Sequence, residues 1–111
     1  MAVDTLMRYL EDGNKQVNIQ FEQGFINRAT ISCHEFQDNN LLYIHTTEGH
    51  QVKIDVSEFK RICFDSVVYD ATNEEEMERC LDYLGCFKYF NAYLQDQSGN
   101  YILDFLFISD K

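Results

Sequence analysis

The chain has 111 residues and a formal net charge of −10, from 19 acidic and 9 basic side chains, and 45% of its residues are hydrophobic. This length and apolar content predict one domain, residues 1–111, that buries a core without metals or disulfides. The negative charge argues against direct binding to nucleic acid or to anionic membranes, because both depend on Lys and Arg. An acidic surface instead fits solubility, a basic protein partner, or imitation of nucleic acid.

The N-terminal segment and the cysteines indicate a cytoplasmic protein. Residues 1–12 have the pattern of an amphipathic helix, so we expect no signal peptide, and no apolar run is long enough to span a bilayer. The four cysteines form no CxxC pair: Cys33, Cys63, Cys80 and Cys86. Reduced thiols are the favoured interpretation, with paired disulfides as the alternative.

Two segments match a helical template. Near the N-terminus, apolar residues spaced i, i+3, i+4 and i+7 predict a helix that ends before Gly13; they are Val3, Leu6, Met7 and Leu10. The second helix, about residues 73–84, begins at Thr72 or Asn73, has three glutamates in its first turn, and ends at Gly85.

Elsewhere the apolar period is two, which predicts strands. Between the helices we expect strands near residues 17–21, 29–33, 41–46, 52–56 and 62–64, with 67–69 extending or restarting the last one. Residues 87–108 predict a hairpin around the turn at Ser98-Gly99-Asn100. Short connections make neighbouring strands antiparallel. The sequence therefore predicts an α+β domain, either a strongly bent antiparallel sheet or a small SH3-like or Sm-like barrel.

The C-terminal hairpin is apolar on both of its faces. A hairpin with one solvent-exposed face would have polar residues at every second position. It therefore lies either at the centre of the fold, covered on both sides, or at a subunit or partner interface. Base stacking is disfavoured, because Lys88 is the only cation between Phe87 and Ile108. The predicted interface of a homo-oligomer consists of Phe87, Tyr89, Tyr93, Tyr101, Phe105 and Phe107.

A run of carboxylates spans the second helix and the segment before it. It comprises Asp65, Asp70, Glu74, Glu75, Glu76, Glu78 and Asp82. This run is either a solvated helix face or a contact surface for a basic protein, such as a nucleic-acid-binding protein. Closely spaced carboxylates can also imitate a row of phosphates, as small phage or mobile-element inhibitors of nucleases or defence complexes do.

We expect no catalytic residue, metal site or cofactor. There is no nucleophile elbow and no glycine-rich phosphate loop. Cys33 and His34 are adjacent on a strand, so their side chains point to opposite faces. His45 and His50 flank a turn and could face each other across a hairpin, but exposed turn histidines are the favoured interpretation.

Residues 1–65 resemble the bacterial Sm-like proteins. The shared pattern is an N-terminal helix, the strand Val17 to Phe21, a Gly24 turn, the segment Arg28 to Ile31, then Asp38 and the run Ile54 to Ile62. The resemblance implies a helix followed by a five-stranded bent barrel, rings formed through the fourth and fifth strands, and RNA binding.

The chain departs from the Sm-like pattern where RNA would bind. Val56-Ser57 stands in place of the family's Lys-His pair, and Glu48, Asp55 and Glu58 occupy the rim that is basic in the family. A similar fold therefore does not by itself imply RNA binding. We predict a non-enzymatic, acidic protein-binding module that forms homo-oligomers. The alternatives are an Sm-like ring that binds RNA or nucleotide, and an acidic inhibitor that mimics nucleic acid.

Overall fold

The computed structural model describes residues 2–12, 15–22, 24–38, 40–64, 67–69, 73–84, 89–99 and 101–108. Within these ranges the chain forms two helices, α1 (Ala2–Glu11) and α2 (Glu74–Leu84), together with nine strands in two sheets. Both helices confirm the sequence-based expectation. Neither is long and apolar enough to cross a membrane.

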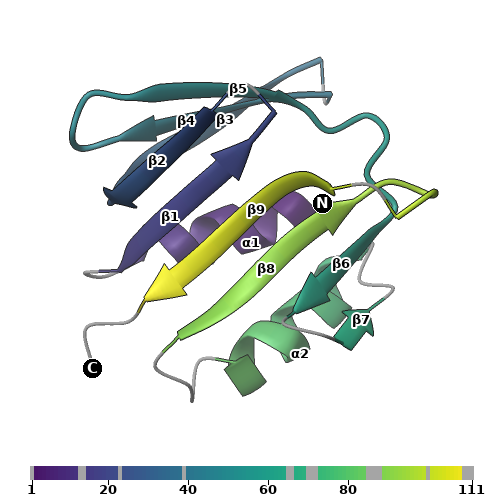
Figure 1. Ribbon diagram of the computed structural model, residues 1–111. Coiled ribbons are helices and arrows are strands. Elements are labelled where there is room, and N and C mark those ends of the chain that lie inside the picture. Colours follow the sequence, from purple (N-terminus) through teal and green to yellow (C-terminus); the bar gives the residue numbers. More distant parts are fainter. Residues whose placement is uncertain are drawn as a thin grey trace.

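The larger sheet contains six strands, all paired antiparallel in the order β2-β1-β9-β8-β6-β7 (Figure 1). They are β1 (Gln16–Phe21), β2 (Gly24–Ala29), β6 (Arg61–Phe64), β7 (Val67–Tyr69), β8 (Tyr89–Gln95) and β9 (Tyr101–Ile108). The predicted C-terminal hairpin is confirmed, because β8 and β9 are neighbours. The hairpin lies in the middle of the sheet, since β9 also pairs with β1.

The smaller sheet has the order β3-β4-β5, formed by β3 (Ile31–Gln37), β4 (Leu41–Thr46) and β5 (Gln51–Asp55). The single strand expected near residues 29–33 is therefore two strands in different sheets. At Arg28 the backbone has a positive φ of 54°, and at Thr30 it leaves the ladder with β1. The Thr30 carbonyl accepts a hydrogen bond from the Thr47 N–H at 2.9 Å, which joins it to the β4–β5 turn.

These strands form two open sheets, so the structure confirms a small α+β domain with antiparallel strands. The barrel alternative is not confirmed, because none of the described strand pairings closes a barrel.

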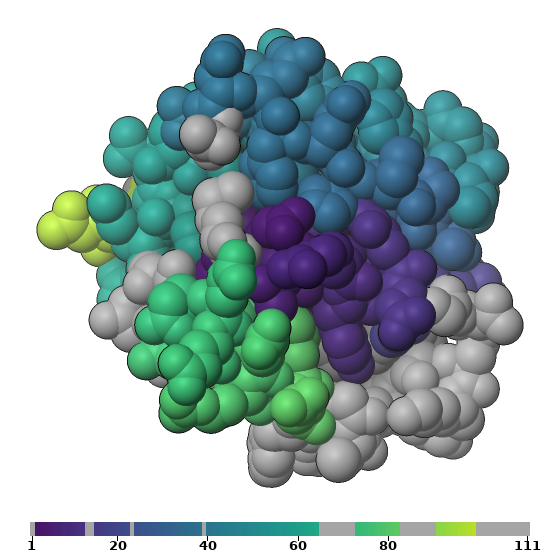
Figure 2. All heavy atoms as spheres, turned by 180° about the vertical axis from the view of Figure 1, so that it is seen from behind, coloured from purple at the N-terminus to yellow at the C-terminus, as the bar shows by residue number. Residues whose placement is uncertain are grey.

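The core lies between the sheets and the helices. The apolar stripe of α1 is almost completely buried, with Val3, Leu6 and Met7 at 0% exposure. It packs in one cluster with residues of both sheets and with Met77 and Leu81 of α2. Seen from the helix side, α1 lies between the smaller sheet and α2 (Figure 2). Each fully buried Leu or Met side chain contributes about 1.5–3 kcal/mol to folding, so this stripe fixes α1 against the sheets.

Both helices cover the same face of the larger sheet (Figure 1). On β1, Val17 and Ile19 point into the core, while Asn18 between them does not. On β8, Ala92 and Leu94 do the same. No described helix or strand covers the opposite face. The hairpin is thus central in its sheet, but among the described elements it is covered on one side.

Candidate functional site

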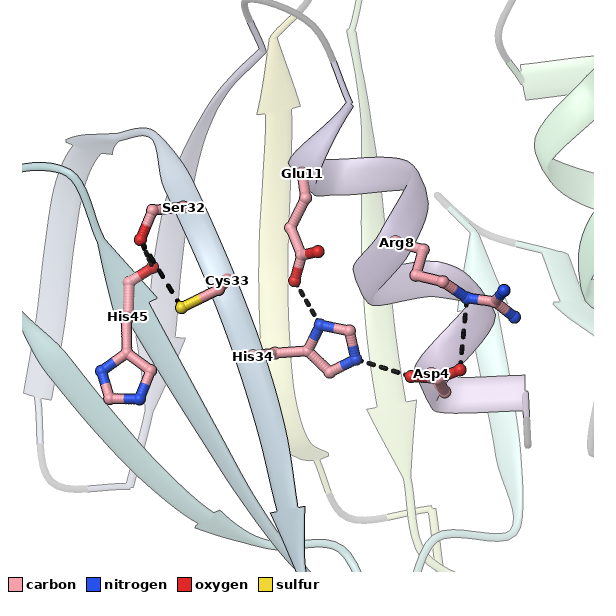
Figure 3. Close-up of polar contacts among 7 residues, drawn as sticks. All are labelled: Asp4, Arg8, Glu11, Ser32, Cys33, His34 and His45. Carbon is pink, nitrogen blue, oxygen red and sulfur yellow. Dashed lines mark hydrogen bonds and ion pairs between the residues drawn. The ribbon is translucent and has the colours of Figure 1, made fainter.

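A group of polar side chains in close contact joins α1 to β3. His34 of β3 lies between two carboxylates of α1, with its Nε2 atom 2.6 Å from Asp4 Oδ1 and its Nδ1 atom bonded to Glu11 Oε1 (Figure 3). The His34 side chain is only 9% exposed. We call Asp4, Glu11 and His34 the His34 clamp.

The helix geometry explains how two carboxylates reach one imidazole. Asp4 and Glu11 are seven residues apart, which is close to two helical turns, so they share one side of α1. Arg8 lies one turn from Asp4, and its Nε atom is 3.2 Å from Asp4 Oδ2. On the strand side, the Phe36 ring stands edge-on to the imidazole, with 5.6 Å between ring centroids.

The His34 clamp is suited to holding α1 in place rather than to catalysis. Ionised carboxylates only accept hydrogen bonds, so both contacts are satisfied when both ring nitrogens carry a proton. Both ring nitrogens are engaged by these carboxylates, so neither is directed at an open position where a metal ion or a substrate could bind. The clamp is therefore a charge-assisted link between helix and strand.

A second polar group lies on the outer face of the smaller sheet. Cys33 points away from His34, as expected for neighbours on a strand, and its register partner is His45 (Figure 3). The Ser32 hydroxyl donates to the His45 carbonyl at 3.0 Å, and His45 Nε2 lies 3.3 Å from Glu35 Oε1. An irregularity in the ladder between Ile31 and Cys33 places two successive exposed residues here.

This arrangement does not assemble a metal site among the described residues. The register partner of His45 on β5 is Gln51, so His45 and His50 do not face each other across the hairpin. Instead the His50 N–H donates to Thr46 Oγ1 at 3.0 Å. In the described part of the chain, no group of three or more His, Cys, Asp and Glu side chains could hold a metal ion.

The uncovered face of the larger sheet carries amide and aromatic side chains. We call it the helix-free face, and its described members include Gln16, Asn18, Gln20, Phe25, Asn91 and Tyr93, together with Cys63 and Arg61 of β6. Phe25 is 58% exposed, on the edge strand β2. Asn91 Nδ2 donates to Tyr93 Oη at 2.8 Å, and Asn18 Oδ1 accepts from the Arg28 N–H at 2.8 Å.

The strands of the larger sheet are poor in charge. Within their bounds the only charged residues are Arg28, Arg61 and Asp104. By contrast, the short helix α2 alone carries five carboxylates. Apart from Asp104, the acidic residues in the described part of the chain therefore lie on the helices, the turns and the smaller sheet.

The acidic run predicted from the sequence is described only in α2. Asp65 and Asp70 lie outside the described residues. All five carboxylates of α2 are exposed: Glu74, Glu75, Glu76, Glu78 and Asp82. Asn73 Oδ1 accepts from the Glu76 N–H at 2.8 Å, which caps the helix as expected. Arg79 is the only cation of α2, and its Nη2 atom lies 3.0 Å from Glu75 Oε1.

The register separates the residues of the predicted oligomer interface. Tyr93 lies on the helix-free face and is partly exposed. Phe105 pairs with Ala92 and Ile19, and Phe107 pairs with Val17, and the side chains of these three partners are buried. For Tyr89, Tyr101, Phe105 and Phe107 the structure describes the backbone, and Phe87 lies outside the described residues. The interface assignment stays a prediction.

The fold and these surfaces define a small α+β protein that has two open antiparallel sheets, two helices on one side, and an amide-rich sheet face on the other. No protein-family model, curated protein or solved structure was found to match this chain. The resemblance to Sm-like proteins therefore remains a prediction.

Sequence reasoning missed both the His34 clamp and the amides of the helix-free face. The clamp had a signal, because Asp4 and Glu11 flank the apolar stripe of a helix at a spacing of seven. The amides of β1 also had a signal in the sequence. Gln16, Asn18 and Gln20 alternate with apolar residues, and none of the three is charged in a strongly acidic chain.

Proposed function

We propose that this protein is a non-enzymatic protein-interaction module and that the helix-free face is its main contact surface. The observation that carries this proposal is the amide and aromatic composition of that face, with Phe25 58% exposed, in a chain with a net charge of −10. Two charged residues also belong to the face by register: Arg61, two residues from the Tyr93 partner Cys63, and Asp104, which pairs with Gln20 and Tyr93. Depletion of Lys, Glu and Asp, together with exposed Tyr and Phe, is the composition that distinguishes interface cores from ordinary surface. Tyr93 and Phe25 are the aromatic anchors of such a contact.

A protein partner explains this face better than a nucleic acid does. Affinity for DNA or RNA depends on cations that displace counterions, and single-strand binders place Lys and Arg between their aromatic residues. Arg28, beside Asn18, is the only cation of the neighbouring strands β1 and β2. Amide and phenol groups, in contrast, pair well with the polar backbone and side chains of a protein.

A binding role also agrees with the chemistry of the histidines. His34 is engaged at both ring nitrogens, and His45 lies on an exposed sheet surface beside Glu35. Neither is positioned as the general base of a nucleophile in the way that acyl or phosphoryl transfer requires.

The acidic face of α2 is a second contact surface in this proposal, and it suits a basic protein. Its five carboxylates are exposed on one short helix with a single cation. Opposite charge across an interface accelerates association and selects the partner. We further propose a reducing, cytoplasmic environment, which is supported by Cys33, Cys63 and Cys80, since these three described cysteines form no disulfide.

Site-specific photo-crosslinking tests the main contact surface. A photoreactive phenylalanine analogue replaces Tyr93 on the helix-free face, and in a control protein it replaces Tyr43 on the outer face of the smaller sheet. We expect a covalent adduct with a protein from position 93 in living cells and none from position 43. Equal labelling from the two positions, or no protein adduct from position 93, would contradict the proposal.

A further inference from the structure

We propose that the His34 clamp makes the docking of α1 sensitive to pH. In this proposal α1 is held most firmly while both ring nitrogens of His34 carry a proton, and loss of one proton loosens the N-terminal turn of the helix. The inference does not rest on the proposed contact surface, because α1 lies on the opposite side of the larger sheet. Three features carry it: the number of protons that the clamp needs, the charges around it, and the place of α1 in the core.

The clamp needs two protons on one imidazole. The Nε2 atom of His34 is 2.6 Å from Asp4 Oδ1, and its Nδ1 atom is bonded to Glu11 Oε1 (Figure 3). An ionised carboxylate only accepts hydrogen bonds, whereas a neutral imidazole has one N–H group and one lone pair. The doubly protonated ring therefore satisfies both carboxylates, and the neutral ring satisfies one. Imidazole is the side chain that exchanges this second proton near neutral pH.

The two contacts of the clamp are not equivalent, and the difference predicts which one breaks. Asp4 has a second partner, because Arg8 Nε lies 3.2 Å from Asp4 Oδ2. For Glu11, His34 is the hydrogen-bond partner found in the described part of the chain. The neutral ring should therefore keep its proton on Nδ1, toward Glu11, and direct the lone pair of Nε2 at Asp4. Two acceptors at this distance repel each other, so the first turn of α1, which contains Asp4, moves away from β3.

The charges on the elements around His34 reinforce this effect. Glu74 of α2 interacts electrostatically with Asp4 and Arg8. On the strand side, the Phe36 ring and the register partner Ile44 carry no charge. The charged groups of the clamp and of its electrostatic neighbours on the two helices are Asp4, Arg8, Glu11 and Glu74. Carboxylates outnumber cations in this set, so loss of the imidazole proton leaves negative charge unbalanced at a nearly buried position.

The place of α1 in the core decides what the loosened helix does. Val3, Leu6 and Met7 are completely buried and pack with residues of both sheets and of α2. This packing continues to hold α1 when one hydrogen bond is lost, so we expect more frequent local opening and not global unfolding. Opening of the first turn exposes Val3 and the apolar residues beneath it. The pH would thus set how often this part of the core is open to water.

Hydrogen exchange of the purified full chain, followed by NMR and corrected for intrinsic exchange rates, tests the inference. A rise from about pH 5.5 to about pH 8.5 crosses the range in which imidazole titrates. We expect the protection of the Leu6, Met7 and Arg8 amides to fall at least about tenfold over this rise, relative to amides of β1 and β8. The ¹⁵N shifts of the His34 ring should report two N–H groups at the lower pH and a proton on Nδ1 at the higher pH.

Glu11→Gln is the informative variant, because an amide donates as well as accepts. Its N–H can bond the Nδ1 lone pair of a neutral ring, while the Nε2 proton stays on Asp4. We therefore expect this variant to keep α1 protected at about pH 8.5. His34→Gln should also remove the pH dependence, with weaker protection at both pH values.

His45→Gln is the matched control, and it should retain the pH dependence of the wild type. The amino terminus also titrates near neutral pH and is the same in every variant. An effect that came from the amino terminus would therefore persist in Glu11→Gln and His34→Gln.

Three results would overturn the inference. The first is protection of α1 in the wild type that does not change with pH. The second is a pH dependence that Glu11→Gln and His34→Gln both leave intact, and the third is a neutral His34 ring that carries its proton on Nε2. If His34→Gln does not fold, the comparison of the wild type with Glu11→Gln and the ring spectra of the wild type decide the question.

Discussion

His34 is the residue that ties α1 to the smaller sheet. We predict that His34→Gln lowers the free energy of unfolding by about 1–3 kcal/mol, because a neutral amide replaces two charge-assisted hydrogen bonds at a nearly buried position. Urea denaturation followed by circular dichroism measures the change.

His45→Gln is the control for this substitution. His45 also has a carboxylate partner, Glu35 at 3.3 Å, but its side chain is 31% exposed and that of Glu35 is 62% exposed. We therefore expect its replacement to change stability by less than about 0.5 kcal/mol. Equal losses for the two variants would contradict the role given to the His34 clamp.

The described thiols differ in burial, so they should differ in reactivity. Cys33 is exposed, Cys63 is buried, and burial raises the pKa of the Cys80 thiol, with a further contribution from the Glu76 carboxylate. The thiolate is the reactive form, so a raised pKa slows alkylation near neutral pH. We predict that iodoacetamide labels Cys33 first, Cys80 more slowly, and Cys63 only on unfolding.

Peptide mass spectrometry of samples taken at successive times reports each cysteine separately in this experiment. Rapid labelling of Cys63 in the folded protein would contradict the burial of β6 between its neighbours.

At the scale of elements, Glu48 links the β2–β3 junction to the β4–β5 turn. Its Oε2 atom accepts from the Thr47 hydroxyl at 2.8 Å, and its Oε1 atom accepts from the Thr30 N–H at 3.1 Å. These two hydrogen bonds lower the pKa of Glu48 below its ordinary value of 4.5, and the bond from the Thr47 hydroxyl has the larger effect. Because its pKa is lowered, the Glu48 carboxylate stabilises the fold at pH values above the pKa that it has in the unfolded chain. This stabilisation is lost as the pH falls through the pKa of the folded state.

Glu48→Gln should therefore lower stability at neutral pH and flatten its decline below about pH 4.5, so that the variant and the wild type converge in acid. Thermal unfolding followed between neutral pH and about pH 3 measures the difference, with Glu58→Gln as the control for an exposed carboxylate on a turn. Parallel pH profiles of wild type and Glu48→Gln would show that the Glu48 link does not contribute.

The elements that local sequence specifies were the ones predicted well. The apolar spacing of α1 and α2, the Asn73 cap and the C-terminal hairpin each depend on residues close together in the chain. The division between β2 and β3 was missed because it depends on the positive φ of Arg28 and on bonds from Thr30 to Thr47 and Glu48. The His34 clamp was missed for the same reason, since it joins a helix to a distant strand.

At the scale of the whole molecule, charge is divided between surfaces that should act independently. We predict that Glu74→Lys, Glu75→Lys and Glu78→Lys together abolish binding to a basic partner and leave the crosslink from position 93 unchanged. The reason is that these residues lie on α2, on the opposite side of the larger sheet from the helix-free face. The salt dependence of partner binding should weaken in parallel, because screening acts on exposed charge pairs.

The matched control reverses the same number of exposed carboxylates elsewhere, as Glu22→Lys, Glu35→Lys and Glu58→Lys. It has the same net charge as the α2 variant, so a response to net charge alone would appear in both. Titration of a candidate partner by calorimetry distinguishes the two variants. If the α2 variant also blocks competition of the protein with DNA or RNA for that partner, the acidic face acts as a mimic of nucleic acid.

The pairing of β1 with β9 has a consequence for biosynthesis. β1 can pair with β2 early, but its second partner, β9, becomes available only after residues 101–108 have been synthesised, since Val17 lies opposite Phe107. Contacts between such distant segments slow folding, because the chain must close a long loop before they form. During that interval β1 is unpaired on the side that β9 later fills, and its open edge is exposed to association with other chains.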